Sequence, residues 1–307
     1  MEWLTGPFEV AFLQRALWSG ILVSLICATT GIWVVLRGMT FLGDAMAHGM
    51  LPGVAVASLC GGNLLIGAAV SAGVMACGVT ALGRAPRLSR DTGIGLLFVG
   101  MLSLGVIIVS RSQSFAVDLT GFLFGDVLAV RERDLTGLAV ALCVALLVSA
   151  LGYRSFLALV FDERKAHTLG LRPRLAHAAL LGLVTLAIVT SFHVVGTLLV
   201  FGLLIAPPAA ALPWSQRVPL VMCGAALSGV AATFIGLLVS WHLGTAAGAT
   251  IAAVAVLLFF LSALASGVRN RRADVAQPAP EDENRSAGSR GEDGRSENHR
   301  REYEHST

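Results

Sequence analysis

Seven long apolar runs constrain this chain more than any other feature, because none of them contains an Asp, Glu, Lys or Arg. They are residues 16–36, 64–83, 92–110, 135–151, 175–191, 218–240 and 245–266. Each run is close to the roughly 20 residues that a helix needs to cross the hydrocarbon core of a bilayer. With 55% hydrophobic and 13% charged residues over 307 positions, the chain is predicted to be an all-α, polytopic membrane protein.

Two further segments are apolar but interrupted. Residues 45–60 contain Pro52 and Gly53, and residues 194–212 contain Pro207 and Pro208. Backbone groups freed at such breaks are tolerated at membrane depth only where protein or a water-filled cavity surrounds them. Counting both segments predicts about nine crossings, with eight as the lower estimate.

The basic residues predict the orientation of the chain. If the N-terminus is outside, the inner loops carry most of the Arg residues and the single lysine, including the clusters at 84–90, 154–174 and 269–272. This asymmetry favours an outside N-terminus and a cytoplasmic C-terminus. It also requires residues 115–130 not to cross, so we predict a re-entrant or interfacial half-helix there.

Composition changes abruptly at Arg269, where charged and small polar residues replace the apolar ones. We therefore predict a transmembrane domain over residues 1–268 and a disordered, charged cytoplasmic tail over 269–307. The tail's charges nearly cancel, which argues against nucleic-acid binding. The five cysteines contain no Cys-x-x-Cys pair and are interpreted as small buried hydrophobes.

Asp44 and His48 are the only charged or titratable side chains between Gly38 and Asn63 except Cys60. Four residues apart, they share one helix face. An ionisable pair inside the membrane indicates function by default. The alternative is a buried polar pair in which His48 hydrogen-bonds Asp44 and stabilises helix packing.

Several enzyme classes lack their motifs here. Lys165 is the only lysine and no glycine-rich loop precedes it, so a phosphate-binding loop is missing. Gly-x-Ser-x-Gly and His-Glu-x-x-His are also missing. Transport is therefore the favoured class, with no catalytic residue. The loop after Gly152 holds Asp162, Glu163, Ala166 and Gly170 in the pattern of a short amphipathic helix, either docking a partner or lying at the headgroups.

Residues 43–55, Gly-Asp-Ala-Met-Ala-His-Gly-Met-Leu-Pro-Gly-Val-Ala, resemble the Gly-Asp-Ala-x-Ser-His-Ala-x-Leu-Pro-Gly-Val signature of the permease subunits of zinc, manganese and iron ABC importers. Further matches follow in order at residues 91–110, 124–130, 161–170, 194–200 and 204–207. The resemblance covers about residues 10–265. Ala47 stands where the family usually has serine, which removes a possible hydrogen bond to a ligand.

The resemblance implies a fold and partners. It implies the vitamin-importer-like (type II) ABC membrane domain, in a bacterial inner membrane, with two copies, expected as a homodimer, forming a central path. Separate cytoplasmic ATPase subunits would hydrolyse ATP, and an extracytoplasmic solute-binding protein would deliver the metal. Asp162, Glu163, Ala166 and Gly170 would then belong to the coupling helix. No permanently bound cofactor is expected.

The resemblance also implies a role for the polar pair. Asp44 and His48 would bind the transported ion briefly, since conduction needs binding weak enough to release. Oxygen and imidazole donors suit zinc, manganese or ferrous iron, and zinc is the first expectation. His193 is a weaker candidate ligand, and Pro52, Gly53 and Pro207 are expected to line the path.

The remaining polar residues are expected to have lesser roles. His177 and His242 are interpreted as interfacial, with His242 expected in a short outer loop next to Trp241. Neither Asp118 nor Asp126 is predicted to be a ligand. Two alternatives stay open: an ion-coupled secondary transporter in which Asp44 titrates and His48 relays a proton, and a scaffold with a structural Asp–His pair.

Overall fold

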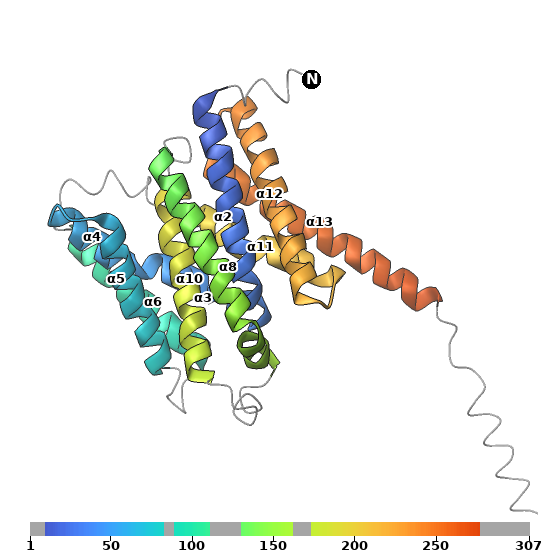
Figure 1. Ribbon diagram of the computed structural model, residues 1–307, viewed down its shortest axis with the longest axis horizontal. Coiled ribbons are helices and arrows are strands. Elements are labelled where there is room, and N and C mark those ends of the chain that lie inside the picture. Colours follow the sequence, from blue (N-terminus) through green and yellow to red (C-terminus); the bar gives the residue numbers. More distant parts are fainter. Residues whose placement is uncertain (1–9, 83–88, 111–129, 162–172, 277–307) are drawn as a thin grey trace, which may run out of the picture. The chain divides into compact units, whose positions relative to one another are not determined.

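The computed structural model describes residues 10–82, 89–110, 130–161 and 173–276, which are mostly helical (Figure 1). In chain order the helices are α2 (Ala11–Leu36), α3 (Thr40–Gly49), α4 (Leu51–Leu59), α5 (Leu64–Leu82), α6 (Arg90–Ser110), α8 (Glu132–Phe161), α10 (Pro173–Val195), α11 (Thr197–Ala211), the 3₁₀ turn η4 (Leu212–Trp214), α12 (Val218–Leu243) and α13 (Ala247–Ala276). The predicted half-helix (except Val130), Asp118, Asp126 and the four coupling-helix residues lie outside the described residues.

The predicted membrane spans are confirmed. Within the described ranges, eight helices are long and apolar enough to cross a membrane: α2, α5, α6, α8, α10, α12, α13, and α11 together with η4. The ninth expected segment, residues 45–60, is occupied by α3 and α4, which are only 10 and 9 residues long. The predicted fold class of an all-α membrane domain with about eight or nine spans therefore holds.

Helix α2 forms the centre of the bundle and is the most buried of the eight candidate spans. The indole of Trp33 donates a 3.0 Å hydrogen bond to Ser149 of α8 and packs edge-on against Phe156. On another side, the hydroxyls of Ser24 and Thr233 of α12 lie 3.0 Å apart. These buried polar contacts align α2 with its neighbours where apolar packing alone is unspecific.

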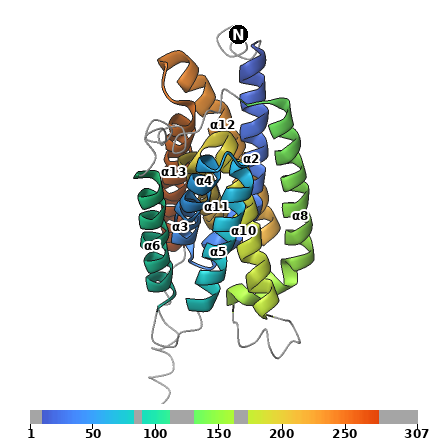
Figure 2. The same cartoon turned by 90° about the vertical axis from the view of Figure 1, so that its left-hand side faces the viewer.

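The two ends of the bundle are tied by different contacts. Phe12 of α2 stacks against Trp241 of α12 at one end, and Arg37 contacts His177 of α10 at the other. Helix α6 ends, and α8 begins, at the end where α2 begins (Figure 2). The two helix ends that flank residues 111–129 therefore lie towards the same end of the bundle.

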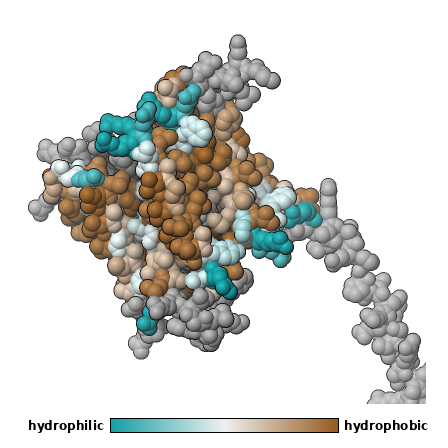
Figure 3. Space-filling view, viewed as in Figure 1, coloured by the Kyte–Doolittle hydropathy of each residue, from teal (hydrophilic) through white to brown (hydrophobic). Residues whose placement is uncertain are grey.

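The flanks of the bundle are apolar. Hydrophobic side chains cover the flank seen in Figure 3, and hydrophilic ones gather towards its upper and lower ends. On α8, one stripe of exposed residues is aliphatic: Val140, Val144, Leu147 and Leu151. Such a surface suits contact with lipid, because these side chains have no polar group that would lose its hydration in hydrocarbon.

The expected interruption at Pro207 and Pro208 is wrong. Both prolines lie inside α11, and the break in this segment is at Gly196, between α10 and α11, with φ of 78°. Pro208 has no N–H for the carbonyl of Leu204, four residues earlier. That carbonyl packs directly against Gly31 of α2 instead. Because the neighbouring helix fills the space beside the freed group, α11 continues through the prolines.

Helix α13 continues beyond the predicted start of the tail. The chain divides into two compact units, Met1–Ala263 and Leu264–Thr307, and the described part of the second unit is the C-terminal part of α13. Arg and Ala residues after Val268 favour helix, and Pro278 follows the last helical residue, Ala276, by two positions. The predicted disorder of residues 277–307 lies outside the described part of the chain.

Candidate functional site

Asp44 and His48 lie on α3, which begins shortly after the turn that ends α2. Gly38 has a φ of 65°, a conformation that glycine adopts without strain, and the chain reverses there. The spacing of four residues brings both side chains to one face of α3, as predicted. The side chain of Asp44 is 31% exposed and that of His48 is 23% exposed, so the pair lies at the edge of the core.

The spacing of the two side chains fits more than one arrangement. The Nε2 atom of His48 is 3.5 Å from the Oδ1 atom of Asp44. A good N–H···O hydrogen bond is about 2.7–3.2 Å long. Two ligand atoms bound at about 2.1 Å to one tetrahedral ion lie about 3.4 Å apart. The separation is therefore compatible with two ligands of one ion and also with a direct contact between the two side chains.

The two imidazole nitrogens of His48 have different surroundings. Nδ1 is fully buried and has no hydrogen-bond partner among the described residues. Nε2 faces the carboxylate of Asp44. An ion held with Asp44 therefore meets Nε2, and the proton of the neutral ring is then on Nδ1.

An aromatic cluster borders the pair, which the sequence did not predict. The ring of Phe98 on α6 meets the His48 ring edge-on, with centroids 5.4 Å apart. Phe98 also meets Phe41 of α3 edge-on, at 5.6 Å. No sequence signal links positions 48 and 98, because only the packing of α6 against α3 joins them.

The expected break near Pro52 is confirmed, at Met50, where α3 ends and α4 begins. Pro52 lies in the first turn of α4, where its missing N–H costs little. Gly53 is helical, and a Cβ atom there would collide with the backbone of Gly67 on α5. The hydroxyl of Ser71 donates a 2.7 Å hydrogen bond to the carbonyl of Gly49. These small residues hold α4 and α5 in close contact.

The other sequence candidates lie apart from the pair. His193 is in the last turn of α10, three residues before Gly196. His177 contacts Arg37 at 2.9 Å, and His242 is helical, within α12, with Nδ1 2.8 Å from the Leu238 carbonyl. The expectation of a loop position for His242 is therefore wrong. The lining of a path by Pro52, Gly53 and Pro207 stays a prediction.

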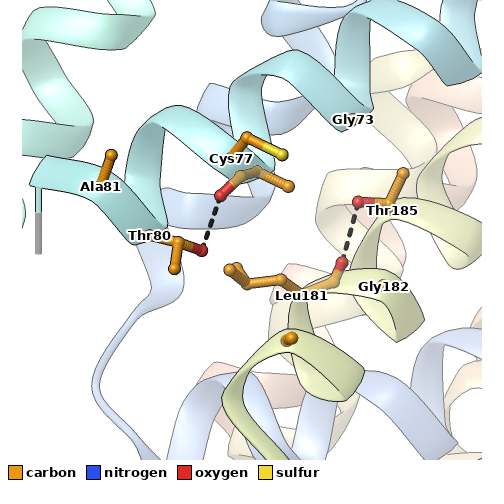
Figure 4. A pocket seen from close by; sticks show the side chains of 9 residues that line it. Gly73, Cys77, Thr80, Ala81, Leu181, Gly182 and Thr185 are labelled. Atoms are coloured by element: carbon orange, nitrogen blue, oxygen red, sulfur yellow. Dashed lines mark hydrogen bonds between the residues drawn. The ribbon is translucent and has the colours of Figure 1, made fainter. Parts of the chain in front are cut away.

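A groove of about 520 Å³ lies between α5 and α10 and is the next place considered for a binding site. Figure 4 shows its lining, in which the Cys77 thiol is accompanied by small and aliphatic side chains. The Thr80 hydroxyl donates to Ala76 and that of Thr185 to Leu181, at 2.9 and 2.8 Å within their own helices. The lining residues thus offer one thiol and two hydroxyl groups, and no carboxylate or imidazole. Asp44 and His48 remain the candidate site.

Membrane-length helices packed around a buried central helix define a polytopic membrane domain. Residues 9–266 match the family model described as ABC 3 transport family, and the chain belongs to this family.

Relatives of known name agree with this assignment. "Manganese transport system membrane protein MntC" of Listeria monocytogenes is 35% identical over 86% of this chain and 94% of the relative. A "Probable iron transport system membrane protein" of Haemophilus influenzae is 34% identical over 88% and 99%. Among solved structures, PsaBC from Streptococcus pneumoniae in complex with Fab superposes with a TM-score of 0.75, at 32% identity over 85% of this chain and 94% of that one. The predicted ABC importer membrane domain is thereby confirmed.

Proposed function

We propose that this chain is the membrane-spanning permease of an ABC importer that carries a divalent transition metal ion. The observation that supports it most is the Asp44–His48 pair, whose donor atoms are 3.5 Å apart on a partly exposed face within a member of the ABC 3 transport family. Carboxylate and imidazole together accept manganese, iron and zinc. Without a thiolate or a buried set of ligands, the pair would bind an ion weakly enough to release it.

Manganese is the cargo that we propose first. The relatives' names include manganese and iron transport systems, whereas the expectation of zinc rested on the resemblance to zinc, manganese and iron importers together with ligand chemistry. That chemistry does not separate the three ions, since each accepts oxygen and imidazole donors. Zinc is therefore the second candidate together with iron.

The proposed permease acts as a pair of copies. Within the described residues, no group of three or more His, Cys, Asp and Glu side chains is gathered to hold a metal ion. One copy thus supplies two ligands, and a second copy facing it would supply two more, which matches four-coordinate binding of zinc and part of an octahedral set for manganese. The partner copy completes the site.

The proposed power source is a separate cytoplasmic ATPase, with an extracytoplasmic binding protein delivering the ion. The chain between α8 and α10 carries Asp162, Glu163, Ala166 and Gly170, and both flanking helices reach the end of the bundle where Arg37 contacts His177. We place that end in the cytoplasm, because the clusters of Arg residues join the helices there.

Uptake of radioactive manganese tests the function. Cells that express the chain with its ATPase and binding protein are expected to accumulate manganese, and a catalytically dead ATPase is expected to abolish this. Competition by unlabelled zinc and iron ranks the three ions. Manganese transport by liposomes that contain this chain alone would overturn the ABC proposal in favour of an ion-coupled secondary transporter.

The stoichiometry of binding tests the paired site. Purified full-length chain is expected to bind one manganese ion per two chains, and His48→Ala is expected to remove that binding. One ion per chain would show that each copy holds its own complete site.

A further inference from the structure

The orientation of the His48 ring is not fixed by hydrogen bonds. Its Nδ1 atom is buried without a partner among the described residues, and its Nε2 atom is 3.5 Å from Asp44, beyond good hydrogen-bond length. Histidines that bind metals normally donate the other ring N–H to an acceptor, which fixes both tautomer and ring direction. Within the described parts of the chain His48 has no such acceptor, so its orientation depends on other contacts.

The ring of Phe98 supplies that contact. Among the described residues it is the only ring packed against His48, with centroids 5.4 Å apart and planes at 80°. Edge-to-face pairs of this kind contribute about 0.5–1.5 kcal/mol beyond simple burial and have a preferred angle. Phe41 packs against Phe98 in turn, edge-on at 5.6 Å and 65°, so the Phe98 ring has an aromatic contact on α3 besides His48.

Helix α6, which carries Phe98, also packs closely against the start of α4, just after the break at Met50. A Cβ atom on Gly105 of α6 would lie 3.0 Å from the Leu51 Cβ atom and 3.3 Å from the Pro52 nitrogen. One turn before Phe98 and on the same face of α6, Ile94 is buried in the core. Helix α6 is thereby fixed against the start of α4, and Phe98 against the end of α3.

We propose that Phe98 is a positioning residue for metal transport: it holds the His48 imidazole with Nε2 directed at Asp44. This inference rests on the proposed function, since it gives Phe98 a role only if His48 binds the transported ion. Phe98 itself touches no ion. Its replacement would leave His48 present but free to rotate, and the two donor atoms would no longer meet at one point.

Two substitutions separate ring packing from simple bulk. Phe98→Leu keeps an apolar side chain but removes the aromatic edge, and Phe98→Tyr keeps the ring. Phe260→Leu is the matched control, because Phe260 makes an edge-on ring pair with Phe259 at 5.3 Å and 61° in α13. All three variants are measured as full-length chains for manganese binding, thermal unfolding and manganese uptake kinetics.

Phe98→Leu is expected to weaken manganese binding and to raise the KM of uptake about tenfold. This is the lower end of the loss in affinity seen when a residue that orients a metal ligand is replaced. Maximal uptake and thermal unfolding should match those of Phe260→Leu, and Phe98→Tyr should retain most of the affinity. Equal KM values for Phe98→Leu and Phe260→Leu, or equal loss in Phe98→Tyr and Phe98→Leu, would overturn the inference.

His48→Ala distinguishes failure of the inference from failure of the function. If His48→Ala keeps normal manganese uptake, the proposed site itself is wrong. If His48→Ala loses uptake while Phe98→Leu behaves as the control does, only the positioning role is wrong.

Discussion

Single residues decide how firmly the proposed Asp44–His48 site would hold an ion. The sequence placed Asp44 and His48 on one helix face, and their donor atoms lie 3.5 Å apart. The buried Nδ1 atom of His48 lacks an acceptor among the described residues, and Ala47 brings no hydroxyl. Histidines that bind metals firmly normally donate their other ring N–H to an acceptor. A ligand of this kind suits an ion that must leave again.

Removing either ligand is expected to stop transport without unfolding the protein. Asp44→Asn preserves the side-chain shape but removes the charge, and His48→Ala removes the imidazole. Each should reduce manganese uptake by at least about tenfold, since even outer partners of metal ligands have effects of this size. The melting temperature should change little, because a 3.5 Å contact between partly exposed groups contributes at most about 1 kcal/mol.

Asp91→Asn is the control for these two variants, since Asp91 is an exposed carboxylate in the first turn of α6. It should retain uptake. Normal uptake together with a lowered melting temperature in Asp44→Asn would instead support the scaffold alternative, in which the pair is structural.

Helices in this bundle pack closely where glycine residues face a neighbouring helix. At one of these contacts, a backbone carbonyl that lacks its helical hydrogen bond lies against a glycine. Gly53 and Gly67 let α4 and α5 approach until a Cβ atom on either would meet the other's backbone. Gly31 accommodates the Leu204 carbonyl that Pro208 leaves without a donor. Lipid-exposed helices gain little from hydrophobic burial against each other, so close packing of this kind carries the association.

The contact between Gly31 and Leu204 predicts a destabilising alanine. In an ordinary helix Gly→Ala stabilises by up to about 1 kcal/mol. Gly31→Ala should instead cost about 1–3 kcal/mol, because its methyl group would overlap a backbone carbonyl that cannot rotate away. Thermal unfolding in detergent measures the difference.

Gly100→Ala provides the matched comparison, since a Cβ atom on Gly100 of α6 would meet nothing within 4 Å. It should be neutral or slightly stabilising. Equal melting temperatures for the two variants would mean that α11 does not approach α2 as closely as described.

The break between α10 and α11 predicts a second glycine effect. Gly196 has φ 78° and ψ 163°, a combination open almost only to glycine. Gly196→Ala should cost about 1–3 kcal/mol in backbone strain, seen as a lower melting temperature. Gly73→Ala, inside α5 and facing open space, should not; a stable Gly196→Ala variant would contradict the assigned break.

At the scale of the whole molecule, the family domain and the C-terminal extension occupy different parts of the sequence. The family match ends at residue 266, and the described helix α13 ends at Ala276. The residues that follow are mostly charged and small polar ones, which cannot bury enough apolar surface to offset the entropy of ordering. The extension is therefore expected to be dispensable for transport.

Truncation tests this expectation. A chain that ends at Ala276 should retain full manganese uptake and an unchanged melting temperature, because no part of α13 is removed. A second truncation after Arg272 cuts into the last turn of α13 and measures whether that turn matters. A large loss of uptake on removing residues 277–307 alone would show that the extension has an essential role.

The sequence by itself determined the membrane class, eight of the helices, the break before α4 and the pairing of Asp44 with His48. These depend on hydropathy over about 20 residues and on helical periodicity, both local properties. Only the tertiary structure decided that α11 continues through Pro207, that the Leu204 carbonyl packs against Gly31, and that Phe98 packs on His48. Each of these depends on which helix lies beside which, and contacts between distant segments leave no pattern in a single sequence.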